Sequence, residues 1–596
     1  MCIRPTFFTL LFMLLLLVQG VGVVSAACSD GDQVQVWSSP LLARPGEPLQ
    51  LLAVATDGEL TELAAVDPAG RRSTLAAVRG GGPPWSLRAI LPAPVRGLYR
   101  IEARRAGGVV ACSEIQVGGA AGKRGNGNWD LPTQALFAAW VEHLFDAPPE
   151  QALSFASLEP VLRDPQRNFL YDYLRNGEDL KVAAEPDCAD LSFFLRAYFA
   201  WKIGLPVAWR ACDRGTATRA PRCDQPEIDR SFIDTMASAE TFRRVSRRVI
   251  DRVTSGGGRT ALDDEASDFY PVPLERNALW PGTVYADPYG HTLMIVKWVP
   301  QTVGRGGLLL AVDAQPDNSV ARKRFWEGTF LFARTPSAGP GFKAYRPPLP
   351  DKGRGGLATP GNTAIAAHSG LPPYSGDQAG LDAEAFYARM EKLINPRGLE
   401  PEDAYEAMLA ALMEQLETRV KSVDNGEQYM RTHPGTVMSM PKGPAIFETV
   451  GPWEDYATPS RDMRLLIALK VLENLPARIR KHPELYVFKQ LLGLKLESAA
   501  DAAARIEQLH ARRIRENFIT YTRTDGSSFR LSLADIYARR PGLEVAYNPN
   551  ECVERRWGAT PGAPDYGTCR RQAPADQRQR MDEYRPWFRE AKRPPR

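Results

Sequence analysis

The sequence predicts a multidomain α+β protein with a β-sandwich at its N-terminus, an α+β core and a mostly helical C-terminal region. The chain has 596 residues, whereas single hydrophobic cores stop growing at roughly 250–300 residues. Residues 28–118 alternate apolar and polar side chains between turn signals, which is typical of strands. Beyond residue 381 the apolar residues recur at helical spacing.

The first residues predict export. Arg4 precedes a nearly unbroken apolar run over residues 7–18, and small residues follow at 24–27. This is the layout of a secretory signal peptide over residues 1–26, with an uncleaved N-terminal anchor or a lipoprotein at Cys28 as alternatives. No later segment is long and apolar enough to span a bilayer. We therefore expect the mature chain in a bacterial periplasm or outside the cell, without a transmembrane span after signal removal.

Charge and motif content weigh against several functional classes. The formal net charge is only +4, which gives no support to a nucleic-acid partner. The sequence contains no zinc-ligand spacing, no phosphate-cradling glycine loop and no Gly-x-Ser-x-Gly elbow. We therefore expect neither a metal nor an organic cofactor.

The cysteines leave one thiol over. Of eight cysteines, Cys2 lies in the signal peptide, so seven remain in a compartment where cysteines pair. Sequence neighbourhood suggests the pairs Cys28–Cys112, Cys212–Cys223 and Cys552–Cys569, although connectivity cannot be deduced from sequence alone. Cys188 is then either a reactive group or a buried structural thiol.

Six segments are expected after the signal peptide. Residues 28–118 form an Ig-like sandwich, 119–130 a linker, and 131–335 an α+β domain with an insertion at 212–282. A Pro/Gly-rich linker at 336–380 leads to a helical domain at 381–546. The polar, basic tail at 547–596 is expected at the surface, pinned by its own disulfide.

Cys188 is expected at the start of a buried helix. Apolar residues follow it at helical spacing until Gly204. The positive end of the helix dipole favours a thiolate there, and free backbone N–H groups can stabilise an oxyanion. The flanking Asp187 and Asp190 are expected to cap the helix, where their charge would oppose thiolate formation.

A histidine and a carboxylate are expected to meet on a hairpin. His291 stands between a glycine turn and an apolar strand at 292–299, and a second apolar strand follows at 308–312. This hairpin would place Asp313 roughly opposite His291, at a Cβ–Cβ separation of about 5 Å. An aspartate at that distance holds the imidazole in the tautomer that accepts a proton from a thiol.

These motifs resemble those of papain-like cysteine peptidases. Pro-Asp-Cys-Ala-Asp at 186–190 resembles the nucleophile helix of transglutaminase-like and NlpC-type enzymes. Trp-Pro-Gly-Thr-Val at 280–284, followed by Gly290-His291, is similar to the NlpC and CHAP pattern, and Leu-Ala-Val-Asp-Ala at 310–314 resembles the transglutaminase strand with the acidic third member. The resemblance implies a papain-like core and the triad Cys188, His291 and Asp313.

The resemblance also implies a substrate class. The sequence departs from these families in two respects, the separation of the cysteine from the histidine and the oxyanion residue. The substrate would be an amide in a cell-wall peptide or a protein. The separation of Cys188 from His291 requires the insertion at 212–282, and the oxyanion residue has only three candidates, Asn168, Tyr171 and Tyr173. The alternative is a non-catalytic cell-envelope binding or scaffold protein. In either case the helical C-terminal region could dock an envelope protein.

Overall fold

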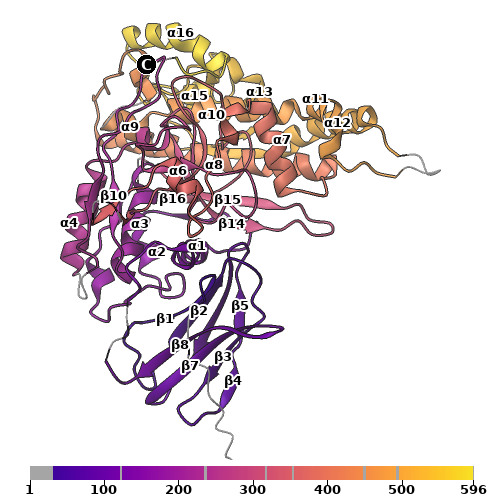
Figure 1. The fold of residues 1–596 in the computed structure, drawn as a ribbon. Coiled ribbons are helices and arrows are strands. Elements are labelled where there is room, and N and C mark those ends of the chain that lie inside the picture. The colour runs from indigo at the N-terminus through magenta and orange to yellow at the C-terminus, as the bar shows by residue number, and fades with distance from the viewer. Residues whose placement is uncertain are drawn as a thin grey trace, which may run out of the picture.

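The computed structural model describes residues 28, 31–120, 122, 124–233, 238–315, 318–351, 353, 355–447, 451–490 and 496–594. The expected signal peptide therefore lies outside the described residues. The described chain mixes helices and strands, as the predicted α+β class requires. Two small sheets lie at one end, a larger sheet lies in the middle, and most of the C-terminal helices lie at the other end (Figure 1).

Residues 31–117, here called the two-sheet segment, form two antiparallel sheets around one core. Its strands are β1 (Val34–Ser39), β2 (Leu49–Ala55), β3 (Glu62–Val66), β4 (Arg72–Thr74), β5 (Ala77–Arg79), β6 (Trp85–Leu91), β7 (Gly97–Arg105) and β8 (Gly108–Val117). The sheet orders are β1-β2-β6-β5 and β4-β3-β7-β8. Leu51 from one sheet and Ile101 from the other bury in the same cluster, because alternate side chains of each strand point to one face.

The middle sheet has seven antiparallel strands in the order β12-β17-β13-β14-β15-β16-β9. These are β9 (Ser154–Phe155), β12 (Phe269–Pro271), β13 (Val284–Ala286), β14 (Thr292–Val299), β15 (Leu308–Ala314), β16 (Val320–Arg324) and β17 (Gly341–Tyr345). Leu310 and Val312 bury in the cluster that includes α1 (Leu131–Leu144) and α3 (Asp190–Ile203). Leu309 and Ala311 bury on the opposite face with α7 (Ala383–Ile394).

Helix α3 is the central helix of this core. All 14 of its residues are buried, as is usual for a helix that is apolar on most sides. Tyr198 stacks on Trp140 of α1, with ring centroids 5.6 Å apart. The helix ends at Gly204, whose φ of 76° is the left-handed conformation that glycine adopts without strain. This packing fixes the start of α3, where Cys188 lies.

Two stretches expected to be peripheral contribute to the core. The strand β10 (Val207–Trp209) directly precedes the expected insertion. The insertion contains β11 (Glu227–Asp229), α4 (Ala239–Ile250), α5 (Ser255–Gly258) and β12, and Phe242 of α4 packs on α3. The stretch 336–380 is more than a linker, because β17 pairs with both β12 and β13 and all five of its residues are buried. Its few apolar residues between glycines and prolines gave too short a signal to predict a strand. The rest of it holds β18 (Leu349–Pro350), β19 (Leu357–Ala358) and α6 (Asn362–Ala366).

The C-terminal region, residues 401–594, packs around one large cluster. Its helices are α8 (Pro401–Thr432), α9 (Pro452–Tyr456), α10 (Pro459–Glu473), α11 (Leu475–Lys481), α12 (Ala499–Glu516), α13 (Leu533–Ala538), α14 (Arg540–Leu543), α15 (Val553–Arg556) and α16 (Ala575–Arg589), and β20 (Phe518–Thr522) pairs with β21 (Ser528–Ser532). The stretch 547–596 differs from the expected surface tail, since Trp557 and Phe588 are buried in this cluster. The apolar residues of this polar stretch are too widely spaced to signal its burial.

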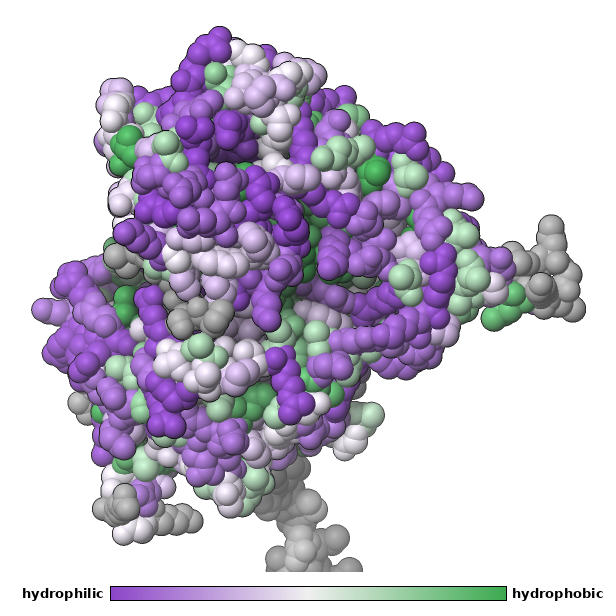
Figure 2. Space-filling model, turned by 90° about the horizontal axis from the view of Figure 1, so that it is seen from above, coloured by the Kyte–Doolittle hydropathy of each residue, from purple (hydrophilic) through white to green (hydrophobic). Residues whose placement is uncertain are grey.

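The face of the molecule that is seen from above is mostly hydrophilic, because polar side chains cover most of it (Figure 2). Within the described residues, none of the helices combines the length and apolar character needed to cross a membrane.

Candidate active site

Cys188 lies at the wall of a cavity of about 330 Å³. It is half-buried, and it is the one described cysteine without a disulfide. It stands two residues before the first residue of α3. Thr292 directly follows His291, and its hydroxyl donates a hydrogen bond to the Cys188 carbonyl. The strand that carries the histidine is therefore tied to the backbone of the cysteine.

The helix start was expected to stabilise the thiolate of Cys188, but the surroundings of Cys188 disfavour the thiolate. Burial is the largest cause that raises the pKa of Cys188, and the negative charges of Asp187, Asp313 and Asp287 raise it further. The carboxylate of Asp187 accepts hydrogen bonds from the backbone N–H groups of Ala189 and Asp190, at 2.7 and 2.9 Å. These N–H groups would otherwise be the donors that favour a thiolate. Asp187 thus caps the helix, and the raised pKa of Cys188 favours the neutral thiol.

His291 and Asp313 are hydrogen-bonded to each other. His291 Nε2 lies 2.9 Å from Asp313 Oδ2. The ladder pairs Met294 with Val312, so its continuation puts Asp313 diagonal to His291 rather than directly opposite. Diagonal neighbours on one sheet face remain within reach of long side chains. Both residues line the same cavity as Cys188.

Asp313 is ionised and held from two sides. Burial alone would raise the pKa of Asp313, but the positive charge of Lys323 and the hydrogen bond with His291 outweigh burial and lower it. The Gln315 amide also donates to Asp313 Oδ2 at 2.6 Å, and Arg461 of α10 donates to the Gln315 oxygen at 3.0 Å. An ionised carboxylate on Nε2 keeps the proton on that nitrogen and leaves Nδ1 as the basic atom.

Asp287 anchors the backbone of His291. It is fully buried, and its Oδ1 accepts hydrogen bonds from the N–H groups of Tyr289 and His291, at 2.8 and 2.9 Å. Its other oxygen pairs with Arg464 of α10. Burial alone would raise the pKa of Asp287, but the charges of Arg464 and His291 outweigh burial and lower it. A C-terminal helix therefore supports the turn that presents the histidine.

The C-terminal region forms much of the cavity wall. Its lining residues include Thr418, Arg419, Trp453, Glu454, Ser460, Arg461, Arg464, Leu465 and Arg593. Sequence reasoning missed Asp287, Gln315, Arg461 and Arg464. The turn motif Asp287-Pro288-Tyr289-Gly290 before His291 was a local signal for the first. The two arginines had no local sequence signal, because their partners lie far away in the chain. Arg464, for example, is 177 residues from Asp287.

The three oxyanion candidates lie elsewhere. Asn168 is fully buried, and its amide bonds to the Leu162 carbonyl at 2.7 Å and to the Tyr198 hydroxyl at 2.8 Å. Tyr173 is buried. Neither of these residues, nor Tyr171, lines the cavity that Cys188 lines. Asn168 and Tyr173 support the core beneath α3, whereas Tyr171 is half-buried.

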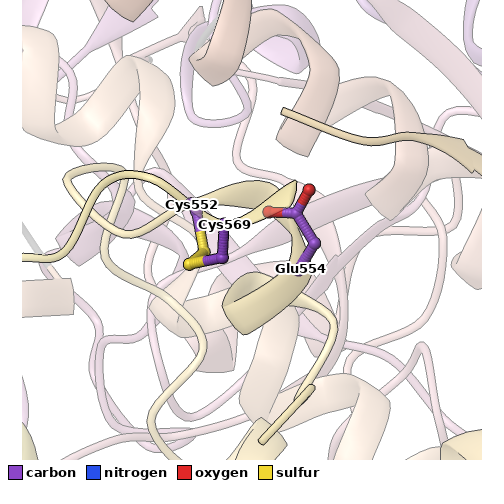
Figure 3. A group of neighbouring side chains, drawn as sticks. All are labelled: Cys552, Glu554 and Cys569. Carbon is purple, nitrogen blue, oxygen red and sulfur yellow. A yellow bond between two sulfur atoms is a disulfide. The ribbon is translucent and has the colours of Figure 1, made fainter. Parts of the chain in front are cut away.

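The three expected disulfides are present as Cys28–Cys112, Cys212–Cys223 and Cys552–Cys569. The last lies beside Glu554, which makes these three residues the one group of potential metal ligands within the described ranges (Figure 3). The two sulfurs are bonded to each other. The Glu554 carboxylate accepts hydrogen bonds from Thr524 and Thr568. No thiolate is left there to bind a metal, and the group is a structural link.

Comparisons with family models, with curated proteins and with solved structures find no match to this chain. The geometry of the cavity is therefore the basis for an assignment of function.

Proposed function

We propose that this protein is an exported cysteine hydrolase that cleaves an amide through Cys188, His291 and Asp313. One observation carries the proposal: Cys188 and the hydrogen-bonded His291–Asp313 pair line a single cavity. These are the residue types and the chain order of papain-like peptidases, which the local motifs resemble. The cysteine lies just before a buried helix. This helix packs on an antiparallel sheet that contains Asp313 and a strand that begins directly after His291, and this arrangement supports the same assignment.

Each side chain has a defined role in the proposed reaction. His291 Nδ1 takes the proton of the Cys188 thiol while the sulfur bonds to the carbonyl carbon of the amide. The imidazolium then gives this proton to the leaving amine as the carbon–nitrogen bond breaks. Water, activated by the same nitrogen, attacks the thioester and releases the carboxylic acid and the free thiol. Asp313 orients the ring and stabilises its charged form.

The environment of the thiol requires a base in the first step. Because the pKa of Cys188 is raised, a neutral thiol predominates before substrate binds. His291 must then remove the proton as attack begins, as in a serine hydrolase, rather than act as half of a preformed ion pair. The buried, ionised Asp313 favours this proton transfer because it stabilises the imidazolium.

The substrate class follows from the compartment and the resemblance. Three disulfides fit an oxidising compartment outside the cytoplasm. A cell-wall peptide or a protein amide is the expected substrate there. The decisive experiment incubates the protein with soluble cell-wall peptides and with unfolded protein and measures the amines released. Activity is expected in the wild type and absent in Cys188→Ala, and full activity of Cys188→Ala would refute the proposal.

A second candidate function is a non-catalytic cell-envelope binding protein. The observation that favours it is the capture of the Ala189 and Asp190 N–H groups by Asp187, since these groups are then not available to an oxyanion. This candidate predicts that neither substrate class releases amines in the wild type. It also predicts that Cys188 stays inert to thiol reagents until the protein unfolds.

A further inference from the structure

A small, enclosed cavity lies between α3, β10 and β17. Its volume is about 20 Å³, which is enough for one occupant of the size of a water molecule. It shares no lining residue with the cavity of Cys188. Apart from Ala208, all of its lining residues are buried. Whatever occupies this cavity is therefore largely shielded from bulk water.

Arg196 of α3 brings a buried positive charge to this cavity. The residue is only 8% exposed, and its guanidinium lies 3.5 Å from the ring centroid of Trp129 and 4.9 Å from that of Tyr345. Its Nη1 donates a hydrogen bond to the neutral side-chain oxygen of Gln134 at 3.0 Å. Burial lowers the pKa of Arg196 to about 9, and no carboxylate of the described chain offsets this effect. The rings and the amide thus hold the guanidinium without neutralising it.

Two hydrogen-bond donors at this cavity have no acceptor. Arg196 Nη2 and Trp209 Nε1 are both buried, and neither has a hydrogen-bond partner in the described part of the chain. Both residues line the cavity. A buried donor without an acceptor costs free energy, and such groups in folded proteins commonly mark a bound water or ion. One small acceptor in the cavity would satisfy both donors.

The charges at the wall favour an anion as this acceptor. No carboxylate is among the described residues that line the cavity, and the second charged lining residue, Arg346, is also positive. The charges of Asp264 and Glu265 act on Arg346, but neither carboxylate lines the cavity. Arg196 is therefore the cation for which the described chain provides no counter-ion. A buried charge without a counter-ion is costly, and a bound anion removes this cost.

We propose that this cavity is a binding site for a monatomic anion, chloride in physiological salt, which accepts hydrogen bonds from Arg196 and Trp209. Its volume selects a single ion over a carboxylate or a phosphate. The ion joins α3 to β10, and so stabilises the helix that begins two residues after Cys188. This site does not depend on the proposed hydrolase function.

The first test is thermal unfolding in two salts. The unfolding of the wild-type protein is followed by tryptophan fluorescence in sodium chloride and in sodium gluconate at equal ionic strength. Gluconate is too large for the cavity, so only chloride can bind the folded state and stabilise it. Chloride should raise the Tm by about 2–4 °C relative to gluconate. Equal Tm values in the two salts would overturn the proposal.

Variants locate the effect. Arg196→Met keeps a long side chain against the rings but removes the charge and the donors, and it should abolish the difference in Tm between the two salts. The matched control is Arg243→Met, which removes an exposed charge of α4 outside the cavity and should keep the difference. Trp209→Phe keeps a ring and removes only the N–H donor, so it should lower the difference by at least about half even where Arg196→Met does not fold. An unchanged difference in Arg196→Met or in Trp209→Phe would refute the site.

Bromide identifies the occupant. Crystals grown in sodium bromide should show an anomalous-scattering peak in contact with Arg196 Nη2 and Trp209 Nε1. A water molecule at that position without an anomalous signal would show that the donors bind solvent, and would overturn the anion site.

Discussion

The two-sheet segment and the C-terminal region are both attached to the seven-stranded core, but only the second reaches the candidate active site. The two-sheet segment meets α1, where the Gly81 N–H donates to the Glu142 carboxylate at 3.2 Å. None of its residues lines the cavity. The C-terminal region contributes Arg461 and Arg464, which contact Gln315 and Asp287. We conclude that the helices are part of the site, whereas the two sheets are support or a separate contact surface.

The ion pairs of the two regions differ in how far they are buried. Arg464 pairs with an Asp287 side chain that is 0% exposed, whereas Arg105 of the two-sheet segment pairs with an Asp57 side chain that is 42% exposed. Surface pairs contribute little because water and salt screen them. A buried charge left without its partner is costly. The comparison therefore predicts different sensitivities to mutation.

The largest expected effect is on the rate of amide cleavage, and it should differ between two histidines. His291 lies beside the C-terminal region, and His143 lies beside the two-sheet segment. His291→Ala should lower the rate of amide cleavage by about 10²- to 10⁴-fold, because the thiol loses its proton acceptor. His143 on α1 contacts Arg88 of the two-sheet segment, and His143→Ala should leave the rate within about twofold of wild type. Steady-state cleavage rates of the two variants make the comparison. Similar losses in both would place the chemistry elsewhere.

The next effect concerns stability. Arg464→Gln leaves Asp287 buried without its ion pair and should lower the free energy of unfolding by about 3 kcal/mol. Arg105→Gln should lower it by less than about 1 kcal/mol. Urea denaturation followed by tryptophan fluorescence measures both. The double variant Arg464→Gln/Asp287→Asn should recover part of the loss, since no unpaired charge remains, and failure to recover would show that the arginine acts through packing.

The smallest effect tests the charge beside the thiol. Asp187→Asn keeps an N-cap acceptor but removes a negative charge that raises the pKa of Cys188. The pKa should fall, the thiolate fraction at pH 7 should rise, and alkylation by iodoacetamide should accelerate by about three- to tenfold. In both proteins the rate should still increase above pH 9. A slower reaction in the variant would contradict the assigned sign.

Local sequence signals predicted the parts of the site that depend on local structure. Pairing the other six cysteines left Cys188 as the free thiol. The helical spacing of apolar residues predicted α3, and strand alternation placed Asp313 near His291. The diagonal offset of that pair depends on hairpin register, which apolar alternation fixes only to within two residues. Asp187 was correctly expected to cap, and its carboxylate accepts hydrogen bonds from the Ala189 and Asp190 N–H groups.

The contacts between distant segments could not be predicted. Arg461 and Arg464 lie in α10, and arginine on a helix normally extends its charged end into water. Their roles depend on how α10 packs against the sheet, and a single sequence contains no signal for that packing. The buried strand β17 was missed for a related reason, since five residues between glycine and proline turns resemble a connection until two neighbouring strands pair with them.

The central claim is that His291 activates Cys188 in the folded protein. The most direct measurement is the rate of Cys188 carboxamidomethylation by iodoacetamide at pH 7, followed by mass spectrometry, in the wild type and in His291→Ala. We predict labelling of the native wild type and a rate at least about tenfold lower in the variant, since the raised pKa of the thiol leaves it dependent on the base. Equal rates in the two proteins, or no labelling before unfolding, would contradict the claim.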